Sequence, residues 1–108
     1  MIVSFEERVG LCALNRIFGF EPKVGLRLIE EFGGAEAVFR DAEEAGKVLG
    51  AYSKTRFATL VTESAFESAA MELEDLESKG CRFVGIGEKD YPGLLMECDD
   101  PPIGLYYK

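Results

Sequence analysis

Apolar residues recur at steps of three and four along the first 80 residues of the chain, which is the spacing of one face of an α-helix. The pattern predicts helices over residues 5–18, 22–32 and 35–40, and a glycine follows each of the first two. Ser4 is a residue type that caps helix N-termini, and Pro22 suits the first turn of a helix. This part of the chain is therefore expected to be a bundle of short helices.

The helical pattern continues in two further segments. Residues 41–50 begin with acidic side chains and end at a glycine, as a short helix does. Residues 53–79 predict a longer helix that Ser53 caps and Gly80 ends, and residues 62–64 are a candidate site for a break in it. The apolar stripe of this helix consists of Phe66, Ala70, Leu73 and Leu76.

After Gly80 the pattern changes from helix to strand and loop. Residues 81–87 are short, apolar and partly β-branched, and residues 103–108 form a second strand-like run. Between them lies a turn-rich loop with a candidate helical turn at residues 93–96, and Tyr91, Leu94 and Leu95 are expected to pack this loop onto the core. Because the second strand ends on an aromatic pair, we expect the chain to be the front part of a longer protein, cut within a larger sheet.

Charge is distributed unevenly along the chain, whose net charge is −8. Residues 1–62 hold 8 Lys/Arg against 9 Asp/Glu, a net of −1, whereas residues 63–108 hold 4 against 11, a net of −7. An acidic second half repels phosphate, but a nearly neutral first half leaves room for a local basic patch. The row of acids from Glu63 to Glu77 is interpreted as a solvated helix face, with a docking surface for a basic partner as the alternative.

Little in the composition points to catalysis. The chain has no histidine, which removes the commonest general base, and its three cysteines show no metal-binding spacing. Cys12 lies among apolar residues, so we expect it to pack in the core. Gly85 and Gly87 follow the first strand, but Asp90 occupies the third glycine position of a dinucleotide fingerprint. We expect no enzyme activity, no catalytic residue, no metal and no cofactor.

The N-terminal residues and the apolar runs bear on location. No apolar run reaches the roughly 18 to 20 residues that span a bilayer. The first ten residues carry two glutamates where a signal peptide has positive charge and then an apolar block. We therefore expect a soluble, cytoplasmic protein with no membrane partner.

The first turn between helices has the outline of a phosphate-binding hairpin. Such a hairpin uses glycines so that backbone N–H groups approach a phosphate at the N-terminus of the following helix. Gly19, Lys23 and Arg27 are the candidate DNA contacts here. However, Glu21 occupies the second glycine position, and Pro22 lacks an N–H. A structural connection between two helices is therefore preferred over a DNA contact.

A second turn, over residues 50–56, is electrostatically better suited to DNA. Lys54 and Arg56 have no adjacent acid, Ser53 lies at an expected helix N-terminus, and Tyr52 could stack on a base. Two positive charges on a surface turn are common, so an ordinary solvated surface is the preferred interpretation. These residues are nevertheless candidate weak DNA contacts.

Several stretches together resemble the N-terminal part of the DNA-processing protein A family (DprA/Smf), and the likeness covers nearly the whole chain. The residues that carry it are Gly19, the pair Pro22-Lys23, Leu28, the stretches EFGGAEAVF (31–39) and LESKGCRFV (76–84), and above all DYPGLLMECDDPPIGLYYK (90–108). The last stretch is the specific one, since the helical part alone is a weak signal.

The resemblance implies a fold that is mainly α. Residues 1–80 would form a SAM-like small helical bundle of helix-hairpin-helix type. Residues 81–108 would be the first strands of a truncated Rossmann-like α/β domain.

The resemblance also implies a function. Members of the family bind and protect single-stranded DNA and help to load the RecA recombinase during DNA uptake, natural transformation and recombination, and they are not known as enzymes. Their main DNA-binding surface lies in the Rossmann-like part beyond this chain. We therefore expect an accessory, protein-interaction domain with a protein partner of its own. The alternative is a helical module that itself binds DNA through its hairpin turns, which would make its binding strongly salt-dependent.

Overall fold

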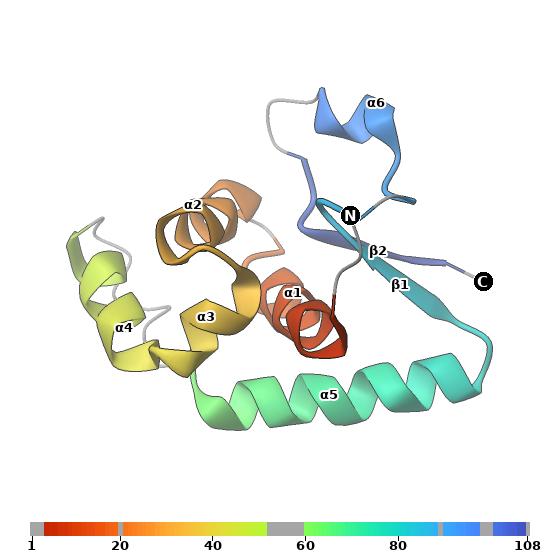
Figure 1. Ribbon diagram of the computed structural model, residues 1–108, viewed down its shortest axis with the longest axis horizontal. Helices are drawn as coiled ribbons and strands as arrows, with labels where there is room; N and C mark the ends of the chain where they lie inside the picture. The colour runs from red at the N-terminus through yellow and green to blue at the C-terminus, as the bar shows by residue number, and fades with distance from the viewer. Residues whose placement is uncertain (1–3, 20, 52–59, 89, 98–100, 108) are drawn as a thin grey trace.

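The structure is a computed structural model of the 108-residue chain, and it describes residues 4–19, 21–51, 60–88, 90–97 and 101–107. The chain is mainly helical and has a small two-stranded antiparallel sheet (Figure 1). In order, the elements are α1 (Phe5–Ile17), α2 (Pro22–Phe32), α3 (Ala35–Arg40), α4 (Ala42–Ala51), α5 (Glu63–Ser78), β1 (Arg82–Gly85), α6 (Gly93–Met96) and β2 (Gly104–Tyr107).

Helix α1 lies at the centre of the molecule. Helices α2 and α3 pack on one side of it, α5 packs along another, and the sheet packs against a third (Figure 1). A helix that is enclosed on several sides has to be apolar around most of its circumference. The run of six residues from Val9 to Leu14 is accordingly buried throughout. Helix α1 therefore organises a core that the helices and the strands share.

Helix α3 is held against α1 by an unusually close approach of the two backbones. A methyl group at Gly10 would lie 2.7 Å from the backbone nitrogen of Glu36, so only glycine fits there. One turn earlier, the carboxylate of Glu7 accepts hydrogen bonds from the N–H groups of Ala35 at 2.6 Å and Glu36 at 2.9 Å. A side chain of α1 thus caps the N-terminus of α3, where the first amides of a helix lack partners.

The sheet pairs two short strands in an antiparallel register, with Phe83 opposite Tyr106 and Gly85 opposite Gly104. A side chain at Gly85 would collide with Leu11, so α1 lies directly against this face of the sheet. The inner strands of Rossmann-like sheets run parallel to one another, whereas β1 and β2 are antiparallel. The expectation that these strands begin such a domain therefore rests on the family resemblance alone.

The loop between the strands is closed by a side chain. Tyr91 is buried, and its hydroxyl donates a hydrogen bond to the carbonyl of Pro102 at 2.6 Å. The expectation that Tyr91 packs this loop onto the core is confirmed. For Leu94 the same expectation is wrong, because its side chain is 80% exposed on the short helix α6.

Most of the expected elements are present. Ser4 caps α1 through its side chain, Pro22 begins α2, and Gly33 ends α2 in the left-handed region with φ of 85°. Helix α5 begins at Glu63, within the segment 62–64 that was a candidate site for a break. The expected start of that helix at Ser53 lies outside the described residues.

Two assignments of apolar faces differ from the expectation. Phe5 belongs to the apolar positions at helix spacing over residues 5–18, but it is 41% exposed, because it is the first residue of α1 and extends beyond the elements that cover the rest of the helix. On α5 the fully buried positions are Ala69 and Leu73, whereas Phe66 and Ala70 are only partly buried. The buried stripe is therefore rotated relative to the predicted one.

Candidate functional site

The first hairpin turn brings two of its three candidate DNA contacts together. Lys23 and Arg27 are exposed and lie one turn apart on α2, where they line the same shallow hollow. Glu30 and Glu31 line that hollow as well. Gly19 is exposed in the turn itself and is not part of the hollow. The basic patch that the sequence suggested is thus balanced by two carboxylates.

Two backbone amides of this turn are engaged in internal hydrogen bonds. The N–H of Glu21 donates to the carbonyl of Phe18 at 3.0 Å, and the N–H of Val24 donates to the carbonyl of Glu21 at 3.1 Å. Pro22, the first residue of α2, has no N–H to offer. A phosphate-binding turn needs amides that point outward at the anion. Glu21, Pro22 and Val24 do not supply them.

Tyr52, Ser53, Lys54 and Arg56 all lie outside the described residues. Their proposed contact with DNA stays a prediction from the sequence.

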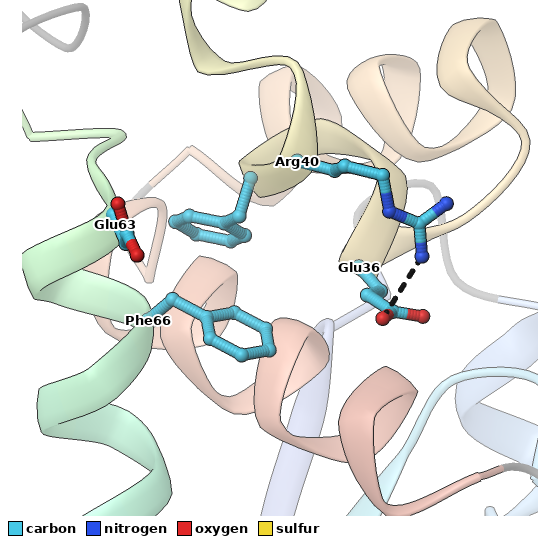
Figure 2. A pocket seen from close by; sticks show the side chains of 5 residues that line it. Glu36, Arg40, Glu63 and Phe66 are labelled. Atoms are coloured by element: carbon cyan, nitrogen blue, oxygen red, sulfur yellow. Dashed lines mark ion pairs between the residues drawn. The ribbon is translucent and has the colours of Figure 1, made fainter.

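A pocket that the sequence did not reveal lies between α3 and the start of α5 (Figure 2). We refer to it as the α3–α5 pocket. Its volume is about 350 Å³, and it is lined by Glu36, Phe39, Arg40, Glu63 and Phe66. The rings of Phe39 and Phe66 lie 5.6 Å apart, centroid to centroid, and are inclined at 49°. This is the tilted contact that aromatic rings favour, and it gives the pocket an apolar wall.

The charges around the α3–α5 pocket are not balanced. Arg40 pairs with Glu36 through a contact of 2.9 Å between Nη2 and Oε2, so these two charges neutralise each other. Glu63 lies on the opposite side of the pocket (Figure 2) and has no ion pair within the described part of the chain. The pocket therefore combines aromatic rings with one carboxylate that no described residue pairs with.

The acidic surface continues from the pocket along α5. Glu72 pairs with Arg16 at 3.2 Å and Asp75 pairs with Lys79 at 3.0 Å. The carboxylates of α5 without an ion pair to any described residue are those of Glu63, Glu67, Glu74 and Glu77. Met71 lies among them with 74% of its surface exposed. An exposed methionine surrounded by acids is the most distinctive feature of this face.

The buried thiol of Cys12 lies elsewhere, between α1 and β2. Its Sγ is 3.0 Å from the hydroxyl of Tyr106, and either group can donate the hydrogen bond that they share. Burial raises the pKa of the Cys12 thiol, and burial together with this hydrogen bond raises the pKa of Tyr106. A thiol that stays protonated is a poor nucleophile, so Cys12 is a packing residue, as expected.

The described residues hold no sign of a metal site or of a membrane-spanning helix. These residues contain no group of three or more His, Cys, Asp or Glu side chains that is arranged to hold a metal ion. No described helix has the length and apolar character that crossing a bilayer requires. Comparison with protein-family models, with characterised proteins and with solved structures found no match to the chain. The family resemblance therefore rests on the quoted residues alone.

Sequence reasoning missed the α3–α5 pocket because its signal is not local. Glu36 and Arg40 are four residues apart on a predicted helix, a spacing that does predict an ion pair. By contrast, Phe39 and Phe66 belong to different helices, and nothing in the spacing of apolar residues predicts that their rings meet.

Proposed function

We propose that this chain is an N-terminal accessory domain of a single-stranded-DNA-binding recombination mediator of the DNA-processing protein A type. Its helical part would be a SAM-like, helix-hairpin-helix-type bundle, and its strands would begin a Rossmann-like domain. The whole protein would act in DNA uptake and natural transformation and would load RecA. This domain itself would bind a protein and have no enzymatic activity.

The observation that carries the proposal is the state of the first hairpin. Its amides at Glu21 and Val24 are engaged within the turn, and Lys23 and Arg27 share their hollow with two glutamates. A net charge of −8 adds a general repulsion between the chain and a phosphate backbone. A hairpin of this kind supports a connecting role and weak DNA affinity. Single-stranded DNA would then be bound mainly by the Rossmann-like domain.

One observation favours the alternative, in which the helical module binds DNA directly. Lys23 and Arg27 are both exposed and lie on one face of α2, one turn apart. Two cations at this spacing can contact neighbouring phosphates. The two functions differ in their dependence on salt, because each phosphate that a cation neutralises releases counterions.

The test is a fluorescence anisotropy titration of a labelled oligo-dT with the chain, at low and at near-physiological salt. Under our proposal the affinity at near-physiological salt is too weak to saturate. The double variant K23E/R27E has a matched control in K47E/K79E, which makes the same change in net charge at two exposed lysines. Micromolar, salt-sensitive binding that K23E/R27E abolishes and K47E/K79E retains would establish the alternative instead.

A further inference from the structure

We infer that the α3–α5 pocket is the docking site for a protein partner, and that this partner is a basic amphipathic helix that inserts a lysine or arginine side chain into the pocket. The inference deepens the proposed function and depends on it only in requiring that the domain binds a protein. Three properties of the surface identify the partner: the shape of the pocket, its charge, and the face of α5 that continues from it.

The shape of the pocket suits the stem of a long side chain. Its volume of about 350 Å³ lies at the small end of the range for ligand sites, roughly 300 to 1,000 Å³. Phe39 is largely buried, whereas Phe66 is only half-buried, so a ring surface is available at the mouth. Lysine and arginine lay their methylene stems along apolar surface while the charged head reaches a polar partner. A cation near a phenyl face gains a further attraction.

The charge of the pocket selects a cation. The ion pair between Arg40 and Glu36 leaves the carboxylate of Glu63 as the unbalanced charge of the lining. The same argument excludes other classes of macromolecule. Nucleic acids and anionic lipid surfaces present phosphates, which this carboxylate and the acids of α5 repel. A protein segment that carries Lys or Arg is the partner that remains.

The neighbouring face of α5 extends this match beyond a single side chain. Glu63, Glu67 and Met71 follow one another at intervals of four residues, and Glu74 comes three residues later. These spacings place all four on one side of the helix. From Glu63 to Glu74 a helix rises about 16 Å, which is three turns. A partner helix of that length would cover Met71 with an apolar residue and face the glutamates with basic ones.

The experiment uses a fluorescein-labelled amphipathic peptide of about 15 residues, long enough for a helix of this span, built from leucine and lysine. A second peptide has glutamate in place of every lysine. Anisotropy is measured as each peptide is titrated with the wild-type chain. We expect the lysine peptide to bind and the glutamate peptide not to bind. Absence of binding by the lysine peptide, at low salt and high protein concentration, overturns the inference.

Matched variants locate the binding. Reversal of the charge at residue 63 in E63K should weaken the affinity for the lysine peptide by about tenfold or more, because like charges then meet in the pocket. The control E30K makes the same change in net charge on α2 and should leave the affinity nearly unchanged. In the opposite direction, R40A removes the partner of Glu36, so the affinity should rise. Equal losses in E63K and E30K would show that net charge alone attracts the peptide, and this overturns the inference.

The outcome is distinguishable from a failure of the proposed function. If oligo-dT binds tightly through Lys23 and Arg27 while the lysine peptide still depends on Glu63, the accessory role is wrong and the pocket stands. If neither binds, the pocket assignment is wrong and the weak affinity for DNA stands. Circular dichroism of each variant verifies that the helices are intact.

Discussion

The guanidinium of Arg8 on α1 lies against the carboxylate of Glu88, which follows β1, with 3.3 Å between Nε and Oε1 in an ion pair that is mostly shielded from solvent. Each partner also contacts the outer edge of β1. Arg8 donates a hydrogen bond to the carbonyl of Phe83, and Glu88 accepts one from the N–H of Gly85. The N–H of Ile86, the next residue, points in the opposite direction and donates a hydrogen bond to the carbonyl of Ile103, which precedes β2. The ion pair thus takes the place that a neighbouring strand would fill.

Removal of Arg8 should destabilise the fold more than removal of an arginine from the surface. The variant R8A leaves the carbonyl of Phe83 and the carboxylate of Glu88 without their partner, a loss of about 1 to 3 kcal/mol in the free energy of unfolding. The control is R16A on the same helix, whose pair with Glu72 is far more exposed and should contribute less than about 1 kcal/mol. Urea denaturation measures both. Equal losses would contradict the role assigned to the edge.

The cap that α1 provides to α3 makes a second prediction. The carboxylate of Glu7 accepts two amide hydrogen bonds at the start of α3, so E7A should lower the free energy of unfolding by about 1 to 2 kcal/mol. E7Q keeps one acceptor oxygen and should lose less. E6A, in the same turn but exposed, serves as the control. Urea denaturation measures all three variants, and an equal loss of unfolding free energy in E6A and E7A would contradict the capping role of Glu7.

The close approach of α1 and α3 predicts opposite effects for one substitution at two glycines. Alanine usually stabilises a helix relative to glycine by about 1 kcal/mol. At Gly10 the added methyl group meets the backbone of Ala35 and Glu36, so G10A should destabilise the fold by about 2 kcal/mol or more. At Gly93, on α6, no atom would lie within 4 Å of the added methyl group, so G93A should be neutral or stabilising. Thermal melts of the two variants should shift in opposite directions or by clearly different amounts.

The hydrogen-bonded pair of the buried Cys12 and the partly exposed Tyr106 predicts a dependence of stability on alkaline pH. Burial raises the pKa of Cys12 above its ordinary value of 9.0, and that of Tyr106 is raised as well. Because the folded state prefers the protonated groups, their contribution is complete below about pH 9 and is lost as the pH rises further. The free energy of unfolding should therefore fall above pH 9, and less steeply in C12A. A fall that is just as steep in C12A would show that the thiol is not responsible.

The sequence predicted those parts of the fold whose causes are local. The end of α2 at Gly33 and the start of α1 at Ser4 each depend on one residue type at one position, and the structure has both. The start of α5 was not predicted in this way: the helix was expected to begin at Ser53, whereas α5 begins at Glu63, where the side chain of Thr62 accepts a hydrogen bond from the N–H of Ala65. The two strands could also be recognised, because the periodicity changes after Gly80.

The pattern of apolar and polar residues did not predict contacts between distant segments. Glu7 caps a helix 28 residues later, and Arg8 pairs with a glutamate 80 positions away, yet in the sequence both look like solvated charges of an amphipathic helix. The exposed side chains of Phe5 and Leu94 show the converse limit. Periodicity identifies an apolar position, but it does not reveal whether another element extends far enough to cover it.

The central claim is that this domain recognises a protein rather than DNA, and amide chemical shift mapping tests it most directly. A ¹⁵N-labelled sample is titrated with oligo-dT and a second one with the lysine peptide, both at near-physiological salt. We predict that the peptide shifts the amides of Glu63 and Phe66 in a saturable manner, while oligo-dT leaves Lys23 and Arg27 unmoved. Saturable shifts at Lys23 and Arg27 with oligo-dT, and none around the α3–α5 pocket with the peptide, would contradict the claim.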